Sequence, residues 1–266
     1  MSMALHRGNG GLRQSYARVP VALLIALGAS VCHQVSETRL SLPLACIDTV
    51  APAVPASLRT FYVDAGTGND AANGLSPSTA WRTLDKANQT VQPGDLVLLK
   101  GTFFNATLRP ARSGTATARI VYRVAPGASA VLDGAAASVG ATVWLDDLSY
   151  IALDGLEIRN TPYGVVSNGN ATFIWLRNLQ LHDVGSAVYL IGSSDNRLED
   201  SNIQRCGDAP SNTGDCVWIA DGSNRNVVVR NIMAYGGHGL IGIGGDQVSM
   251  QPSRDNVVAL NDLANP

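Results

Sequence analysis

The chain has 266 residues, of which 45% are hydrophobic and 15% are charged, and its formal net charge is −2. This balance, with no run of Lys or Arg, excludes the basic surface that nucleic-acid binding requires. The low charge and the 27 glycines suit stacked strands joined by tight turns. One elongated all-β domain is therefore expected.

The first 31 residues have the layout of an export signal. Three arginines come first: Arg7, Arg13 and Arg18. They precede an apolar run from Val21 to Val31, which is too short to span a bilayer comfortably. The pattern predicts a protein that is secreted or held at the cell surface, bacterial in its signal architecture, with no stable membrane span. Cys32 leaves a lipid anchor as the alternative to a cleaved signal peptide.

Residues 32–59 are rich in Pro and Ala and are expected to form a linker, so that the folded domain covers residues 60–266. A short strand at residues 60–63 opens this domain. Hydrophobic residues then recur at helical spacing, at Trp81, Leu84, Ala87 and Val91. We expect this helix to cover the open end of a stack of strands. Three further strands follow, at residues 95–101, 119–124 and 130–134.

The second half of the chain repeats one pattern five times. Each copy is an alternating apolar strand that is interrupted by Asp, Asn or Gly and resumed at once by another strand. The anchors recur every 23 to 31 residues, at Leu156, Leu179, Ile203, Ile232 and Leu263. Such a period is typical of a solenoid. Because the alternation has a period of two rather than 3.6 residues, the sequence predicts a β-solenoid and excludes helical repeats.

Several short segments of the first half occur in a characteristic order. They are Tyr62-Val-Asp, Gly68-Asn-Asp, Pro77, Trp81-Arg-Thr-Leu, Pro93-Gly-Asp-Leu-Val, Gly101-Thr-Phe, Ile120-Val-Tyr-Arg, Ala125-Pro-Gly and Leu132-Asp-Gly. In this order they resemble the start of secreted right-handed parallel β-helix proteins of the pectate-lyase-like superfamily. The resemblance implies an all-β fold whose coils each have three strands, with an N-terminal capping helix. Members include pectate lyases, alginate lyases, chondroitinases, uronate epimerases and some glycosidases, so the fold alone does not give the reaction.

In this fold the corner between the second and third strands often carries inward-pointing Asn side chains. The corresponding residues here are Asp154-Gly155, Asn178, Asn202, Asn231 and Asn261-Asp262. A column of oxygen ligands could bind calcium. Buried backbone groups need hydrogen-bond partners, however, and a structural Asn ladder is the expected outcome.

The first strand of each coil forms the floor of the substrate groove in the family. Here these strands read Gly164-Val-Val-Ser, Ala187-Val-Tyr-Leu, Cys216-Val-Trp-Ile and Gly239-Leu-Ile-Gly. If the first Val of each strand and Leu240 point inward, alternation places the next residues outside: Val166, Tyr189, Trp218 and Ile241. We expect Tyr189 and Trp218 to bind substrate by stacking on sugar rings. The alternative is that a loop covers them.

Elimination on an acidic polysaccharide needs a group that neutralises the C5 carboxylate, a base for the C5 proton and an acid for the leaving oxygen. Five residues near one edge of the expected floor have suitable side chains: His238, Asp215, His182, Tyr235 and Arg159. We expect them to supply the catalytic groups of a polysaccharide lyase that acts on a uronate-containing polymer. The family's lyases use Asp clusters with calcium, or a Lys and Arg pair. This chain has no such cluster and no Lys after Lys100, so neither mechanism transfers residue by residue.

Whether the chain is an enzyme stays open at this point. A non-catalytic extracellular module for glycan binding or adhesion is the alternative function. A glycosidase ranks last, because it needs two carboxylates about 5 to 10 Å apart, and only Asp215 and Asp221 stand out near the floor. The expected partner in each case is an extracellular polysaccharide.

Cys206 and Cys216 flank a turn-rich insertion, and we expect them to form a disulfide in an oxidising compartment. Two unrelated thiols are the alternative. No metal ligand is assigned and no cofactor is certain. Residues 64–70 resemble one turn of a calcium-binding repeat. Such turns bind calcium only when several copies follow one another, so calcium remains the one metal ion for which the sequence leaves a possible site.

Residues 257–263 begin a fifth repeat, and the sequence stops at Pro266. A solenoid that ends within a coil exposes unpaired strand edges. The expectation is therefore a fragment that lacks C-terminal coils, or a chain that is monomeric or associates end to end.

Overall fold

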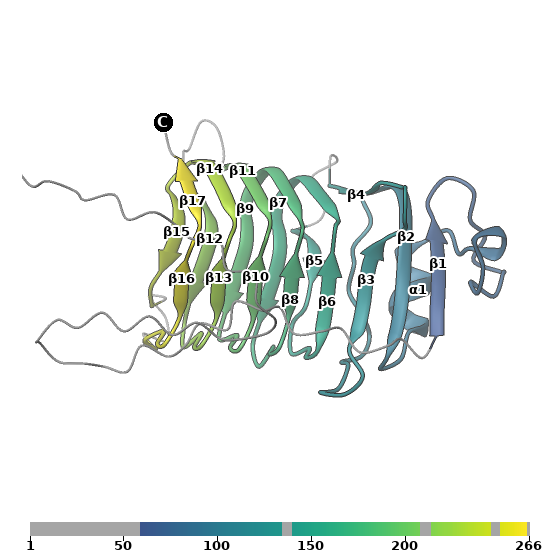
Figure 1. Cartoon of the computed structure of the whole chain (residues 1–266), viewed down its shortest axis with the longest axis horizontal. Coiled ribbons are helices and arrows are strands. Elements are labelled where there is room, and N and C mark those ends of the chain that lie inside the picture. The colour runs from purple at the N-terminus through teal and green to yellow at the C-terminus, as the bar shows by residue number, and fades with distance from the viewer. Residues whose placement is uncertain (1–58, 135–139, 208–213, 246–250, 265–266) are drawn as a thin grey trace, which may run out of the picture. The chain divides into compact units, whose positions relative to one another are not determined.

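The computed structural model describes residues 59–134, 140–207, 214–245 and 251–264, which form a right-handed parallel β-helix of about 6 turns (Figure 1). The predicted fold class is confirmed. Among the described residues, no helix has the length and apolar content needed to cross a bilayer. The predicted export signal, and the linker up to residue 58, lie outside the described residues.

The N-terminal end of the β-helix is covered as the sequence predicts. Strand β1 (Arg59–Asp64) is followed by a 3-10 turn, η1 (Pro77–Thr79), and by helix α1 (Leu84–Thr90). The Thr83 side chain accepts a hydrogen bond from the Lys86 backbone N–H and caps the helix. Leu84 and Ala87 are buried in the core. Helix α1 therefore confirms the predicted capping helix, although Trp81 lies just before it.

The strands lie on three faces, which we number in chain order, and each coil from β3 to β15 contributes one strand to each face. Face 1 contains β1, the first half of β2 (Asp95–Phe104), β3 (Ile120–Val124), β6 (Ile151–Asp154), β8 (Trp175–Arg177), β10 (Arg197–Glu199), β13 (Val227–Val229) and β16 (Val257–Ala259). Face 2 contains the second half of β2, β4 (Ala130–Asp133), the first halves of β7 (Glu157–Asn168) and β9 (Gln180–Ile191), β11 (Asn202–Cys206), β14 (Ile232–Gly236) and β17 (Asp262–Ala264). Face 3 contains β5 (Ala141–Trp144), the second halves of β7 and β9, β12 (Asp215–Ala220) and β15 (Gly239–Ile243).

The interior column of face 2 defines the repeat. Its members pair directly from coil to coil: Ile158, Leu181, Ile203, Met233 and Leu263. The first four are fully buried. This differs from the predicted anchors, because Leu156 and Leu179 lie two residues earlier and Ile232 points outward, with 52% of its surface exposed. Inserted residues on either side of face 3 lengthen the later coils and shift the apparent register.

Each coil bends at residues in the left-handed region of backbone space. At the corner from face 1 to face 2 these residues have φ between 52° and 75°, and they stack as Gly155, Asn178, Asp200, Arg230 and Leu260. Asn, Asp and Gly reach this region at the least cost. Asn178 therefore belongs to the bend itself, not to the Asn ladder that the sequence pattern indicates.

The ladder lies one residue further along the same corner. Ser201, Asn231 and Asn261 stack there, and the side-chain oxygen of each accepts a backbone N–H from the coil before. Asn202 lies outside this ladder, on the exterior of face 2, where it pairs with Gln180 and Ile232. The expected Asn ladder is thus present, with Asn231 and Asn261 as its correctly predicted members.

A second ladder, which the sequence analysis missed, lies at the corner from face 3 to face 1. Asn196, Asn226 and Asn256 stack in register, and each oxygen again accepts a backbone N–H of the preceding coil. Buried serines 167, 193 and 223 run beside them. Both ladders satisfy backbone groups that no strand pairing reaches.

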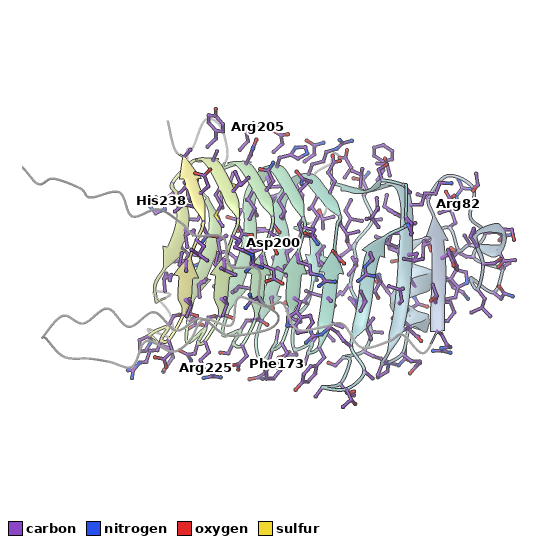
Figure 2. All side chains as sticks on the ribbon, viewed as in Figure 1. Arg82, Phe173, Asp200, Arg205, Arg225 and His238 are labelled. Carbon is purple, nitrogen blue, oxygen red and sulfur yellow. A yellow bond between two sulfur atoms is a disulfide. The ribbon has the colours of Figure 1, made fainter. Side chains whose placement is uncertain are left out.

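Three ion pairs join bend residues of successive coils, one at each corner: Asp183 with Arg205, Asp195 with Arg225, and Asp200 with Arg230. All six residues have positive φ. Each guanidinium is bidentate, with N–O distances between 2.6 and 2.8 Å. Figure 2 shows Arg205 and Arg225 at opposite edges of the β-helix, with Asp200 between them.

The turn after β1 is held by two carboxylates. Asp64 accepts hydrogen bonds from the backbone of Gly66 and Thr67, and its other oxygen contacts Lys100 Nζ at 2.9 Å. Burial alone would raise the pKa of Asp64, but the hydrogen bonds from Lys100, Thr67 and Gly66 outweigh it and lower the pKa to about 2. Asp70 likewise accepts hydrogen bonds from Thr83 and Arg82.

The first prediction compares the stability contribution of a ladder residue, Asn231, with that of an exterior residue, Asn202. Asn231 is 1% exposed, so Asn231→Ala leaves buried backbone groups of Ser201 and Leu198 without partners. We expect the free energy of unfolding to fall by about 2–3 kcal/mol in urea denaturation. The control, Asn202→Ala on the exterior, should change it by less than about 0.5 kcal/mol. Equal losses in the two variants would contradict the assigned register.

The second prediction concerns acid stability. Because the pKa of Asp64 is depressed in the folded protein, its contribution to stability is present above about pH 4 and is lost as the pH falls through about 2. Asp64→Asn should remove this part of the pH dependence. Urea denaturation from pH 5 downward should therefore show the wild type losing stability more steeply than the variant. Parallel curves would exclude this role for Asp64.

Candidate functional site

An exterior row of large side chains crosses face 3. Strand pairing places Trp144, Val166, Tyr189 and Trp218 side by side on four successive coils, and Gly242 continues the row. Tyr189 and Trp218 are half-buried and lie outside, opposite the interior residues Val188 and Val217. The alternation predicted from the sequence therefore holds for both residues.

The row ends differently from the sequence prediction. Val217 pairs with Ile241 and Trp218 with Gly242, so the inward residue of β15 is Ile241 rather than Leu240. A Cβ atom at Gly242 would overlap Cε3 and Cζ3 of the Trp218 ring, and one at Gly244 would lie 3.2 Å from its Cη2. The ring of Trp218 therefore lies over the backbone of the next coil, which has no side chain to lift it.

Two tyrosines extend the aromatic surface toward the start of the strands. Tyr163 packs edge-on against Tyr189, with ring centroids 5.5 Å apart and an interplanar angle of 62°. Tyr163 is exposed and pairs with Ser186 in the exterior row that also contains Asp215. Neither Tyr163 nor Trp144 was predicted from the sequence. Trp144 follows an inward Val exactly as Trp218 does, and that repeated Val-Trp pair was the available signal.

Asp215 and His238 form a pair at the start of the β12 and β15 strands. His238 Nδ1 lies 3.2 Å from Oδ1 and 3.3 Å from Oδ2 of Asp215. The Asp215 side chain is 12% exposed and that of His238 is 71% exposed. Gly239 gives the carboxylate room, since a Cβ atom there would lie 2.6 Å from Asp215 Oδ1. Figure 2 shows His238 near the end of the β-helix that carries β15.

This pair has the arrangement of an oriented general base. A carboxylate beside Nδ1 accepts the proton of that nitrogen and so favours the tautomer in which Nε2 keeps its lone pair. Nε2 then faces solvent on a side chain that is mostly exposed. An imidazole held in this way can accept a proton at Nε2.

Arg159 and His182 belong to a different group of side chains, on the exterior of face 2. Arg159 donates to Asp133 at 2.8 Å and to Glu157 at 2.7 Å. His182 Nε2 lies 3.3 Å from the same Glu157 oxygen. The hydrogen bond with Asp133 is the largest cause that raises the pKa of Arg159. Arg159 is therefore a committed ion-pair partner, and its charge is already neutralised.

The same group continues to the next corner. His182 Nδ1 lies 2.7 Å from Asp183 Oδ2, and Arg205 binds Asp183 through two nitrogens. The Arg205 hydrogen bond, helped by that of His182, holds the pKa of Asp183 well below its usual range. Six side chains thus form one chain of ion pairs and hydrogen bonds across coils, which we call the ionic chain: Asp133, Arg159, Glu157, His182, Asp183 and Arg205.

The five predicted catalytic residues therefore separate. Asp215 and His238 meet beside the aromatic row, whereas Arg159 and His182 lie in the ionic chain. Tyr235 occupies the bend position opposite Arg205, with φ of 58°, and is 55% exposed. Tyr235 does not stack with Arg159 and His182, because His182 pairs with Gln204 and Gln204 pairs with Ala234.

A disulfide joins Cys206 to Cys216, with Cα atoms 5.1 Å apart. It connects the two groups along the chain, since Arg205 precedes Cys206 and Asp215 precedes Cys216. The backbone N–H of His238 also donates to Gly214 O at 3.0 Å, just before Asp215. The disulfide and this hydrogen bond together hold the start of the segment that carries Asp215 and Trp218.

The described residues offer no site for a metal ion built from three or more His, Cys, Asp or Glu side chains. Asp64 and Asp70, in the turn that echoes a calcium-binding repeat, already accept hydrogen bonds from backbone N–H groups and neighbouring side chains. Their donor sets fit a cap turn better than a calcium shell.

The third prediction tests the disulfide. The double variant Cys206→Ser and Cys216→Ser should lose about 3 kcal/mol of unfolding free energy, because the bond closes a loop with a sequence separation of 10. Urea denaturation with and without a reducing agent measures this loss. Reductant should lower the stability of the wild type and leave the variant unchanged. A wild type that is indifferent to reductant would contradict the prediction.

No protein-family model matches the chain, and no curated protein matches it at a significant level. Solved structures do match. Pectate lyase Pel9A superposes with a TM-score of 0.60 at 21% identity, over 68% of this chain and 49% of that enzyme. An alginate lyase from Paenibacillus sp. str. FPU-7 gives a TM-score of 0.53 at 19% identity, over 76% of this chain and 75% of that one.

A GH136 lacto-N-biosidase from Eubacterium ramulus gives a TM-score of 0.54 at 15% identity, over 76% of this chain and 55% of that enzyme. The chain thus spans about half the length of Pel9A and of the biosidase. Sequence identities this low establish the fold and not the reaction. The strand order, the three parallel faces and these superpositions agree: the chain has a right-handed parallel β-helix fold.

Proposed function

We propose that the protein is carbohydrate-active and binds an extracellular polysaccharide across the exterior of face 3. The observation that carries the proposal is the row of Tyr189 and Trp218 on neighbouring strands, next to the Asp215 and His238 pair. Successive strands lie about 4.8 Å apart, so a chain of sugar rings lying along the row meets an aromatic side chain at each of these two coils. The C–H faces of a sugar ring are apolar and pack on such rings.

Two further features support this proposal. Exposed apolar side chains that gather on one surface often mark a binding site, and Tyr163, which packs against Tyr189, is 38% exposed. The Cys206–Cys216 disulfide suits a protein that works outside the cytoplasm, in accord with the export-like N-terminal sequence. The matched solved structures are named as a pectate lyase, an alginate lyase and a lacto-N-biosidase, all of which act on carbohydrates.

The catalytic form of the proposal is a polysaccharide lyase acting on a uronate-containing polymer. His238 Nε2 takes the C5 proton, the electrons of that C–H bond form the C4–C5 double bond, and the C4–O bond breaks. The leaving oxygen takes a proton from a nearby acid, and Asp215 positions the imidazole. What favours this candidate is the contact of 3.2 Å between His238 and Asp215 beside the aromatic row. Arg159 does not serve as the neutralising cation, because Asp133 and Glu157 occupy it.

The second candidate is a non-catalytic glycan-binding or adhesion module. It is favoured by the lack of Lys and Arg in the described strands of face 3, where a uronate carboxylate would need one. A glycosidase that uses Asp215 and Asp221 ranks last. Asp215 begins β12 and Asp221 follows its last residue, so the two lie about 20 Å apart, which exceeds the separation of about 5 to 10 Å that glycosidases use.

The fourth prediction separates binding from catalysis. Purified protein is tested against pectate, alginate and chondroitin for binding and for the absorbance of an unsaturated product. Trp218→Ala should weaken binding by about tenfold to a hundredfold, since roughly 1.4 kcal/mol changes Kd tenfold. The control is Phe104→Ala, an exposed aromatic on face 2 that should leave binding unchanged.

In the same experiment His238→Ala should retain binding and abolish product if the protein is a lyase, whereas His182→Ala should retain both. Binding without product in the wild type favours the non-catalytic module. Binding that survives Trp218→Ala unchanged would contradict face 3 as the site. Product that survives His238→Ala would contradict His238 as the base.

A further inference from the structure

Charge is distributed unevenly around the β-helix. The described segments that form face 3 and its ends are residues 141–147, 161–169, 184–192, 214–222 and 236–245, and none of them contains Lys or Arg. They contain four carboxylates and one histidine: Asp146, Asp147, Asp215, Asp221 and His238. The described segments of face 3 therefore carry net negative charge, most of it at the ends of the strands. Asp147 is exposed there, whereas Asp146 and Asp221 each have one buried side-chain oxygen.

The arginines of the same coils lie on the other two faces or at the bends. Seven of them contact a carboxylate: Arg123, Arg159, Arg177, Arg197, Arg205, Arg225 and Arg230. Arg119 instead donates to the backbone carbonyls of Ile151 and Phe173. The cation that comes nearest to face 3 in these contacts is Arg109, whose Nη2 lies 3.8 Å from Asp146 Oδ2. The Arg109 side chain is 65% exposed, so its attraction for the Asp146 carboxylate is weak.

An acidic floor repels a polyanion and tolerates or attracts other glycans. Repulsion between carboxylates of the ligand and carboxylates of the protein disfavours binding when no counter-ion lies between them. At a solvent-exposed face, dissolved salt is what screens this repulsion. A calcium ion could bridge two anions, but the described carboxylates of face 3 form no group of three that could hold one. Asp215 is also engaged with His238, at the opposite end of the strand from Asp221.

We propose that the glycan bound on face 3 carries no carboxylates. This inference rests on the proposed function of face 3 as the glycan surface. The Tyr189 and Trp218 row supplies the contact with the sugar rings, and the acidic side chains select against polyuronates. The substrate class then differs from the uronate polymers that a lyase would need.

Chemically matched polymers test the inference. Pectate is compared with fully methyl-esterified pectin, and alginate with its propylene glycol ester, so that each pair differs only in the carboxylates. Chitosan and N-acetylated chitin oligosaccharides separate amino-bearing from neutral glycans. We expect the esterified member of each pair to bind more tightly than its acid form, in chelator and in calcium alike. Tighter binding of pectate or alginate would overturn the inference.

Charge variants of the protein give the second arm. Asp147 and Asp221 both have positive φ, 54° and 59°, a conformation that Asn adopts readily, so Asp147→Asn with Asp221→Asn should preserve the fold. The double variant should bind chitosan about threefold more weakly at low salt and leave neutral glycans unaffected. Asp255→Asn is the matched control, at a bend with φ of 56° outside face 3. An equal effect of Asp255→Asn would count against the acidic floor.

The outcomes distinguish the two proposals. If polyuronates bind best and Trp218→Ala abolishes that binding, the charge inference fails and the glycan surface stands. If no polymer of any class binds to folded protein, both fail together. If neutral or amino-bearing glycans bind and Trp218→Ala weakens them, both are supported.

Discussion

The constraint on which this β-helix depends is the register of its left-handed bends. Each coil must place residues at positive φ at the same corners, and most L-residues adopt that conformation only at a cost of about 1–2 kcal/mol. The columns accordingly favour Asn, Asp and Gly. Where Arg takes the position, as Arg205 and Arg230 do, a carboxylate on the preceding coil holds it through two hydrogen bonds. The positions of the bends then determine which residues of successive coils stack in the core columns, the polar ladders and the exterior rows.

Much of this architecture could be predicted from the sequence, and the failures share one cause. Within a strand, side chains alternate with a period of two, which was enough to place Tyr189 and Trp218 outside. Between coils, alternation says nothing about register once residues are inserted. Ile232 therefore replaced Met233 as the predicted anchor. At a bend, the left-handed position and the ladder position are adjacent and accept the same residue types, so Asn178 could not be told from a ladder residue.

The candidate site was harder to predict because its contacts cross coils. Asp215 and His238 each stand at the start of a face 3 strand, and that shared position was visible in the sequence. The state of Arg159 was not, because its partner Asp133 lies 26 residues earlier, on the preceding coil. A charged residue on a solenoid surface meets its neighbours above and below rather than its neighbours in sequence. Chemistry read from residue type alone overlooks whether the charge is already neutralised.

The Trp218 ring extends over the backbone of the following coil, because Gly242 and Gly244 have no side chains that would occupy this space. The breadth of the aromatic floor along the axis is thus set partly by what the next coil lacks. Any side chain at Gly242 would overlap the indole and displace it from this position. The shape of such a surface is consequently a property of pairs of coils, and a comparison that matches functional groups one by one would overlook the glycines that shape it.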